Sequence, residues 1–238
     1  MFFKKKKIIL EAYAPIGDLV DLFPPVRADE LTPKWYQSLP AKPTPGLTVK
    51  HCPGIRDMLS KGFIIPLWAD YNITIASHGL CDITSGMENM NVPPLTSHPI
   101  DFQAEGAWPN HINLKFNNPW VFWCSEPIEW VWVQPTMWQQ HPQELLLVPG
   151  ITEFRYQSTA NINTITELPK DPVTLSFKAG TPMAQLVPLI KDDWELRVDI
   201  LTPEIYSRKF ANWKFSLIHH AQYLQRKNII SGKTKCKY

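Results

Sequence analysis

Residues 111–133 read HINLKFNNPWVFWCSEPIEWVWV, and this stretch decides the fold class. His111–Phe116 alternates polar and apolar residues, which is the pattern of a strand that buries one face. Trp120–Cys124 and Ile128–Val133 follow as short runs rich in tryptophan and valine, which favour strands. The break at residues 125–127 predicts that these two runs form a hairpin.

Segments of the same kind recur on both sides of this stretch, about ten residues apart. Turn signals such as Pro149-Gly150 separate several of them. Many short strands at this spacing predict a mainly β fold, built as one domain, either a β-sandwich (jelly-roll-like) or a distorted barrel. The expected strands are Lys7–Tyr13, Phe63–Leu67, Ala69–Ala76, Leu145–Val148, Ile151–Tyr156, Ala160–Thr166, Val173–Phe177 and Met183–Ile190.

The N-terminal part is rich in proline. Eight of the 23 prolines fall in residues 15–53, so this stretch cannot be regular helix or central strand throughout. We expect an ordered arm that wraps the β domain. It would contain a short helix at Leu31–Leu39, capped by Thr32, and a second helix at Gly54–Lys61 that stops at Gly62.

The chain changes character after Thr202. Pro203–Lys227 has no glycine or proline after its first residue, and its apolar residues recur every three or four positions. This pattern predicts a C-terminal helix with a basic outer face. The expected organisation is therefore a β domain over residues 1–202, which includes the arm, followed by a basic helix and tail over residues 203–238.

The charge is unevenly distributed. The formal net charge is only +2, but Lys4–Lys7 is a run of four lysines, and residues 208–238 hold eight basic and no acidic side chains. Residues 8–207 hold 12 basic and 22 acidic side chains. Basic ends of this kind suit contact with nucleic acid or with an acidic partner, and the alternative is attraction to the acidic body of the same chain.

Cysteine content and hydropathy indicate the cellular setting. The four cysteines are widely spaced and form no CxxC pair, which is not a disulfide framework. No signal peptide is visible, and no apolar run approaches the length of a membrane span. We expect a cytoplasmic protein with no membrane contact.

Recognisable catalytic signatures are missing from the sequence. It has no Gly-rich phosphate loop, no GxSxG and no His-x-Asp or His-x-Glu pair of the kind that non-haem iron enzymes use. His51-Cys52 with His78 and Cys81 could form a soft-metal site, but we favour the interpretation that the cysteines are small buried residues beside ordinary histidines. Cys124 has no neighbour in sequence that would lower its pKa. We therefore predict no metal and no cofactor.

Four tryptophans lie within 13 residues, at Trp120, Trp123, Trp130 and Trp132. Trp130 and Trp132 share one face of a strand, whereas Trp120 and Trp123 point in opposite directions. Some of this group must be core. An exposed remainder would be a stacking platform for a base, a sugar or a protein partner.

Several motifs resemble an uncharacterised family of proteins found in bacteria and in tailed phages, notably marine ones. They are PGITEFRY at 149–156, FKAGTPMAQLVPL at 177–189, HCPGI at 51–55, GFIIPLW at 62–68 and PKW at 33–35. The resemblance extends over residues 25–195. It implies a setting, the host cytoplasm or the virion of a phage, and no activity.

The first two of these motifs are also locally similar to dUTPase and dCTP deaminase. In that family a Gly-x-x-Asp-x-x-Tyr turn holds the sugar, and a later strand closes the barrel. Gly150, Glu153 and Tyr156 match the turn with Glu in place of Asp, and residues 180–186 match the strand through Gln185. The similarity implies a dUTPase-like barrel with Glu153 as catalytic base and Tyr156 and Gln185 as ligand-binding residues. The family's phosphate-binding segment is absent.

These observations lead to three hypotheses of function. The first is a non-enzymatic binding or structural assembly protein, phage-encoded on the resemblance, that acts through a tryptophan-rich face and basic ends. Its partner would be another protein or a further copy of itself. The second is a nucleotide-binding or nucleotide-hydrolysing enzyme, whose partner is a small molecule. The third is a metal-dependent jelly-roll enzyme.

Overall fold

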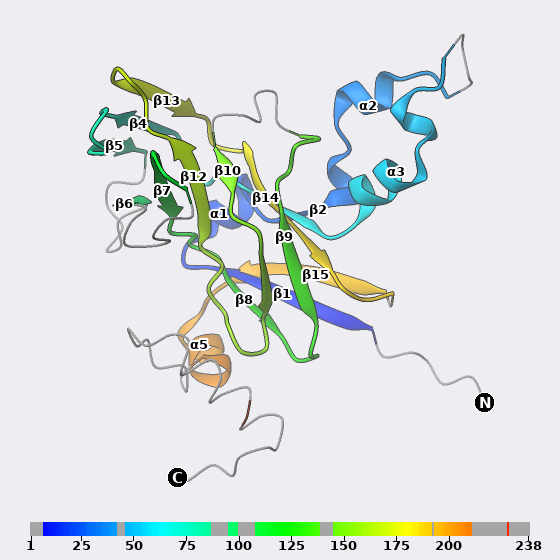
Figure 1. The fold of residues 1–238 in the computed structure, drawn as a ribbon. Helices are drawn as coiled ribbons and strands as arrows, with labels where there is room; N and C mark the ends of the chain where they lie inside the picture. Colours follow the sequence, from blue (N-terminus) through cyan, green and yellow to red (C-terminus); the bar gives the residue numbers. More distant parts are fainter. Residues whose placement is uncertain are drawn as a thin grey trace, which may run out of the picture.

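The computed structural model describes residues 7–41, 46–86, 95–99, 108–138, 145–191, 193–210 and 228. Within these ranges the fold is mainly β, as predicted, and the strands form four sheets (Figure 1). None of the four sheets closes into a barrel over the part of the chain that is described. The architecture is that of a sandwich, in which sheets pack face to face.

The first sheet has three strands in the order β15-β1-β8. β1 (Ile8–Ala14) runs parallel to β15 (Trp194–Ile200) and antiparallel to β8 (Val121–Cys124). Alternate residues of β1 point into the core, where Leu10 and Ala12 are buried. The parallel pair joins segments from opposite ends of the sequence.

The second sheet has five antiparallel strands in the order β11-β9-β14-β3-β2. Their bounds are β11 Gly150–Glu153, β9 Glu129–Val133, β14 Pro182–Pro188, β3 Phe63–Pro66 and β2 Val26–Arg27. All of β3 is buried, because this strand is covered on both faces. Its Phe63 ring lies 5.5 Å from the ring of Phe122 in β8, so the first two sheets pack on each other.

Two further sheets complete the sandwich. One has the order β10-β12-β7-β6, with β10 Leu146–Leu147, β12 Ile162–Glu167, β7 His111–Phe116 and β6 Leu95–Pro99. The other has the order β13-β4-β5, with β13 Val173–Phe177, β4 Tyr71–Ile75 and β5 Cys81–Ser85. The rings of Tyr71 and Phe116 meet at 5.5 Å between them. The predicted inward faces are confirmed, since Tyr71, Ile73 and Ile75 of β4 and Ile112, Leu114 and Phe116 of β7 are buried, although Asn113 on the other face of β7 is buried too.

Short helices make up most of the proline-rich arm. They are α1 (Gly17–Leu22), the 3-10 helices η1 (Ala28–Leu31) and η2 (Val49–His51), α2 (Lys34–Ser38) and α3 (Pro53–Ser60). α1 lies against β15, whereas α2 and α3 project to one side of the sheets instead of wrapping them (Figure 1). The helix cap predicted at Thr32 is wrong by one residue, because α2 begins after Pro33.

The C-terminal helix begins as predicted. α5 (Pro203–Lys209) is capped by Thr202, whose hydroxyl oxygen accepts a hydrogen bond from the backbone N–H of Ile205 at 3.3 Å. The continuation predicted to Lys227 falls on residues 211–227, which lie outside the described residues.

The hairpin predicted between Trp120–Cys124 and Ile128–Val133 is wrong. β8 pairs with β1, and β9 pairs with β11 and β14, so consecutive strands belong to different sheets. β8 and β9 each bury one face of large side chains. These two faces point toward each other across the sandwich, whereas in a hairpin the strands would lie next to each other in one sheet. The connection lacks the Asn-Gly type of turn that holds a hairpin together. Four strands, β2, β5, β6 and β15, were not predicted.

Gly62 gives a direct test of this packing. Its φ is +74°, and a Cβ at this position would come within 1.8 Å of the carbonyl oxygen of Leu186 in β14. We predict that Gly62→Ala lowers the free energy of unfolding by about 2–4 kcal/mol, because both the backbone strain and the clash must be relieved. Urea denaturation measures this change.

Gly54 in α3 is the matched control. Nothing lies within 4 Å of a Cβ built there, and its φ is not in the left-handed region. Gly54→Ala should therefore raise stability by about 0.5–1 kcal/mol. Equal effects of the two substitutions would show that β14 does not approach Gly62 as described.

Candidate functional site

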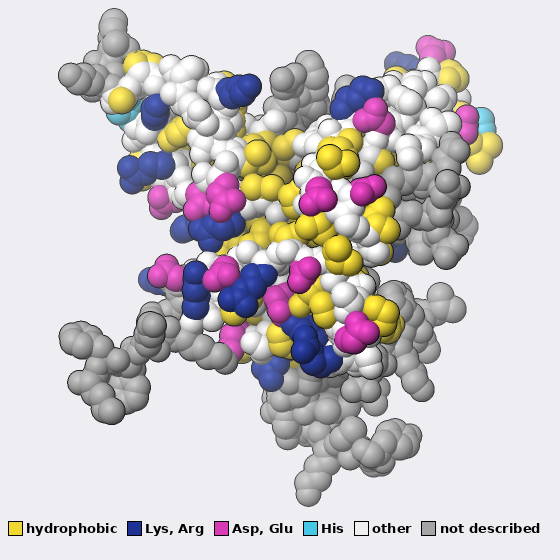
Figure 2. Space-filling view, turned by 180° about the vertical axis from the view of Figure 1, so that it is seen from behind, with side chains coloured by type: hydrophobic (Ala, Val, Ile, Leu, Met, Phe, Trp, Pro, Cys, Tyr) yellow, Lys and Arg dark blue, Asp and Glu magenta, His cyan; other side chains and the backbone are white. Residues whose placement is uncertain are grey.

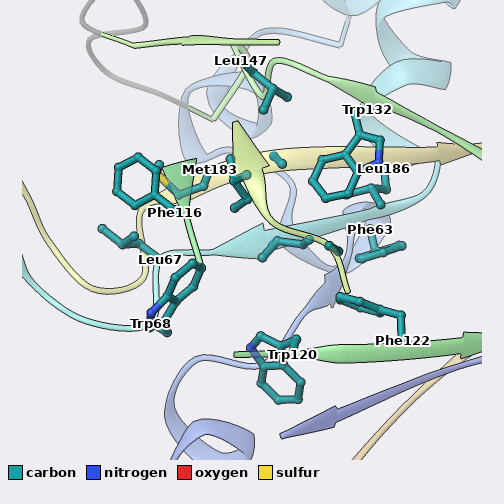
Figure 3. Close-up of a cluster of buried hydrophobic side chains, with 14 of the residues drawn as sticks. Phe63, Leu67, Trp68, Phe116, Trp120, Phe122, Trp132, Leu147, Met183 and Leu186 are labelled. Carbon is teal, nitrogen blue, oxygen red and sulfur yellow. The ribbon is translucent and has the colours of Figure 1, made fainter. Parts of the chain in front are cut away.

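The tryptophan group lies mostly in the core. Trp120, Trp130 and Trp132 are 0%, 0% and 6% exposed, and Figure 3 shows Trp120 and Trp132 among side chains from both layers of the sandwich. The indole N–H of Trp132 donates to the hydroxyl of Thr152 at 2.8 Å. Of the two interpretations of this group, the core interpretation therefore holds for these three residues, and they present no stacking surface to solvent.

Trp123 is the exception, since it lies on the outer face of the three-stranded sheet and is half-buried. The ammonium group of Lys209, from α5, sits 4.3 Å from the centre of its ring. The same ammonium group pairs with the carboxylate of Glu11 and donates to the hydroxyl oxygen of Tyr13 at 2.9 Å. This contact occupies the ring of Trp123 and attaches α5 to the sheet.

Tyr13 and Glu11 complete this cluster, which we call the Lys209 anchor (Glu11, Tyr13, Trp123 and Lys209). The hydroxyl of Tyr13 donates to Glu11 Oε1 at 2.9 Å. Burial, followed by this bond to a carboxylate, raises the pKa of Tyr13 above its ordinary value, so the phenol stays neutral. The arrangement pairs a partly buried lysine with a carboxylate and holds α5 on the sheet.

Glu153 and Tyr156 are close to each other. Glu153 ends β11, and its carbonyl oxygen accepts a hydrogen bond from the backbone N–H of Tyr156 at 3.0 Å. Both side chains are buried, and the guanidinium of Arg155 lies 5.9 Å from the centre of the Tyr156 ring. Glu153 and Tyr156 are therefore neighbours, and both side chains are covered.

Gln185 does not join them. Both residues lie beside β9, on its two sides. Glu153 of β11 pairs with Glu129 at the start of β9, whereas Gln185 of β14 pairs with Val133 at its end. Four residues of extended strand separate the two pairings, which is about 13 Å. The structure therefore does not bring Glu153 and Tyr156 together with Gln185.

The side chain of Gln185 has a structural role. Its amide Nε2 donates to the carbonyl oxygens of Met58 at 2.7 Å and Lys61 at 2.8 Å, at the end of α3. These are the carbonyl groups that a helix leaves unpaired at its C-terminus. Gln185 thus ties the arm to β14, and this use of a buried amide could not be read from the sequence.

The cysteines and histidines do not form a site among the described residues. Within those ranges no group of three or more His, Cys, Asp or Glu side chains could hold a metal ion. The His51 Nδ1 atom lies 3.2 Å from the Thr48 hydroxyl, and the His51 side chain thereby helps to cap the start of η2. Cys124 is buried, and burial raises the pKa of its thiol, which disfavours the thiolate that a nucleophile needs.

Large apolar side chains are exposed on the arm. Leu31, Trp35, Leu47 and Val49 are all exposed, and they fall within 19 residues of sequence. The exposed basic residues Lys34, Arg56 and Lys61 lie on the same segment. We call residues 31–41 and 46–61 the arm surface. Trp35 lies within the helix predicted at Leu31–Leu39, and nothing in the sequence indicates that this segment projects from the sheets.

The arm surface is held in a defined position. The indole N–H of Trp35 donates to the carbonyl oxygen of Met137 at 2.8 Å, and the indole N–H of Trp138 donates to the carbonyl oxygen of Leu31 at 2.6 Å. Lys50 donates to the carbonyl oxygen of Leu39 at 3.0 Å and so joins η2 to α2. The exposed apolar groups are therefore presented on a fixed backbone.

Comparisons with protein-family models, with curated proteins and with solved structures find no match to this chain. The resemblances to a phage and bacterial family and to dUTPase stay predictions. No helix in the part of the chain that is described has the length and apolar character needed to cross a membrane.

The cysteines allow a test of the packing around Cys124. With Cys236 replaced by serine, we predict that Cys52, which is exposed, reacts fast with a water-soluble disulfide reagent in the native protein. Cys124 should react only when the protein unfolds, because its thiol is buried and has a raised pKa. Mass spectrometry of partially labelled protein identifies the site. Labelling of Cys124 as fast as Cys52 would contradict the structure.

The Lys209 anchor predicts a measurable coupling energy. The side chains of Lys209 and Glu11 are 11% and 19% exposed, so their attraction is only partly screened. A double-mutant cycle with Lys209→Met and Glu11→Gln should give a coupling of about 1–2 kcal/mol in urea unfolding.

The pair between Lys178 and Asp70 is the matched control. Its side chains are 83% and 50% exposed, and exposed pairs couple by about 0–1 kcal/mol. If the Lys209 pair couples no more strongly than this pair, α5 is not anchored to β1 as described.

Proposed function

We propose that this protein is a non-enzymatic assembly protein that binds further copies of itself through the arm surface. The observation that carries the proposal is the combination of exposed apolar and basic side chains on a projecting, hydrogen-bonded segment. Exposed apolar clusters with a polar rim are typical of protein interaction sites. A surface that is already ordered also loses less conformational entropy on binding.

The charge distribution supports a second copy as the partner. Residues 31–61 hold five basic side chains and one acidic side chain. Residues 8–30 and 62–207 hold seven basic and 21 acidic side chains. The arm surface and the rest of this range therefore have opposite charge, and complementary charge steers and orients association. On the family resemblance, such an assembly would form in the host cytoplasm or in a phage particle.

Leu47 is the residue of choice for testing the proposal. It is 79% exposed, so its replacement should leave the fold intact. We predict that the wild-type mass in sedimentation velocity rises with concentration, and that Leu47→Glu raises the dissociation constant at least about tenfold, because an apolar contact is lost and an acid is introduced into a basic surface.

Leu80→Glu provides the control. Leu80 is 68% exposed in the loop between β4 and β5, far from the arm in sequence, and its replacement should leave the concentration dependence unchanged. A wild-type protein that stays monomeric at every concentration refutes the proposal. An equal effect of the two substitutions would show that the association is not specific to the arm.

A further inference from the structure

A second surface of the molecule combines apolar and acidic side chains. α1 buries Leu19 and turns Asp18, Asp21 and Leu22 to solvent, and Leu22 is 65% exposed. Ile16, directly before the helix, is also exposed. Residues 18, 21 and 22 are neighbours on one side of a helix, so the two carboxylates flank an apolar side chain.

The end of β15 and the start of α5 extend this surface. The backbone N–H of Leu201 donates to the carbonyl oxygen of Ala14 at 2.7 Å, which holds the end of β15 beside the start of α1. A Cβ at Gly17 would lie 3.6 Å from the exposed side chain of Ile200. Glu204 follows in the first turn of α5 and is exposed.

We call this surface the α1 patch and define it as Ile16, Asp18, Asp21, Leu22, Ile200 and Glu204. Figure 2 shows hydrophobic side chains beside acidic ones over α1 and toward α5, and basic side chains both over the arm and over the three-stranded sheet. The α1 patch exposes three acidic side chains, whereas the arm surface exposes three basic side chains, Lys34, Arg56 and Lys61, and one acidic side chain, Asp57. Arg208, also exposed on α5, borders the patch.

We infer that the arm surface of one copy docks on the α1 patch of the next copy. This inference rests on the proposed function and adds the surface that receives the arm. Apolar side chains on both surfaces would be buried together, with Lys34, Arg56 and Lys61 facing the acids of the patch. Charges of opposite sign at the rim set the register and disfavour the pairing of like surfaces.

The arm surface is held away from the α1 patch of the same chain. Trp35 and Leu31 hold it to residues 137–138, and β2 pairs with β3 in the five-stranded sheet. The α1 patch is built on β15, in the three-stranded sheet. The contact therefore joins two copies. Since it uses two different surfaces, it is head-to-tail, and it closes into a ring or extends as a filament.

The test uses one variant on each surface. Leu47→Glu disables the arm surface. Asp21→Lys combined with Leu22→Ser disables the α1 patch, and a lysine near the C-terminal end of α1 is favourable for the helix. Each variant alone should have a dissociation constant raised at least about tenfold in sedimentation velocity. Asp82→Lys, an exposed charge reversal on β5, should leave association unchanged.

A mixture of the two variants gives the decisive result. The intact arm surface of the patch variant can bind the intact α1 patch of the arm variant. The resulting dimer has no further intact arm surface and no further intact α1 patch. The mixture should therefore form a one-to-one dimer that does not grow, whereas the wild type continues to larger species. Wild-type association should weaken as salt is added, because the rim charges are screened.

The outcomes separate the inference from the proposed function. If the wild type associates and the patch variant behaves like the wild type, the arm binds elsewhere, and the inference is wrong while the proposed function stands. If the mixture stays monomeric although both variants keep the wild-type circular dichroism and melting curve, the inference is also wrong. A wild type that never associates refutes both.

Discussion

Five aromatic rings join the two central sheets, and the rest of the structure is built around this contact. Phe63 lies 5.5 Å from Phe122 and 5.3 Å from Trp130, and Trp130 lies 5.0 Å from Trp194. Phe154 closes the group against Phe122 at 4.9 Å. These rings come from five separate segments of sequence. Large side chains that bury this much area dominate the energy of a core. The contacts among these rings therefore determine how the strands that carry them are positioned.

The helical segments are attached to this framework at a few specific points. The guanidinium of Arg27 lies 5.0 Å above the Trp194 ring and donates to the Trp194 carbonyl oxygen at 3.0 Å, which fixes the start of the arm. Gln185 holds the end of α3 from within β14. Lys209 holds α5 on the opposite face of the three-stranded sheet. Both proposed interaction surfaces are thereby given definite positions, although neither belongs to the core.

The strands that could be predicted from the sequence are those whose own residues alternate between buried and exposed faces. The alternation in residues 71–75 and 111–116 reports burial of one face, whatever the partner strand is. Pairing depends on distant residues, so the hairpin of β8 and β9 was predicted wrongly, and the hydrogen bonds of Gln185 to the end of α3 were not foreseen. β15 carries the same alternation, with apolar Trp194, Leu196, Val198 and Ile200 separated by charged residues, so the sequence did contain a strand signal there. Composition alone could not tell a core tryptophan from an exposed one.

The parallel pairing of β1 with β15 has a consequence for synthesis on the ribosome. Ile8 lies opposite Trp194, so β1 emerges early and waits for most of the described chain before its second partner exists. Contacts so distant in sequence slow folding, and an unpaired apolar strand invites association between nascent chains. Lys4–Lys7 stands directly before this strand, and flanking charges of this kind suppress aggregation. The lysine run thus stands where its charge opposes association between nascent chains.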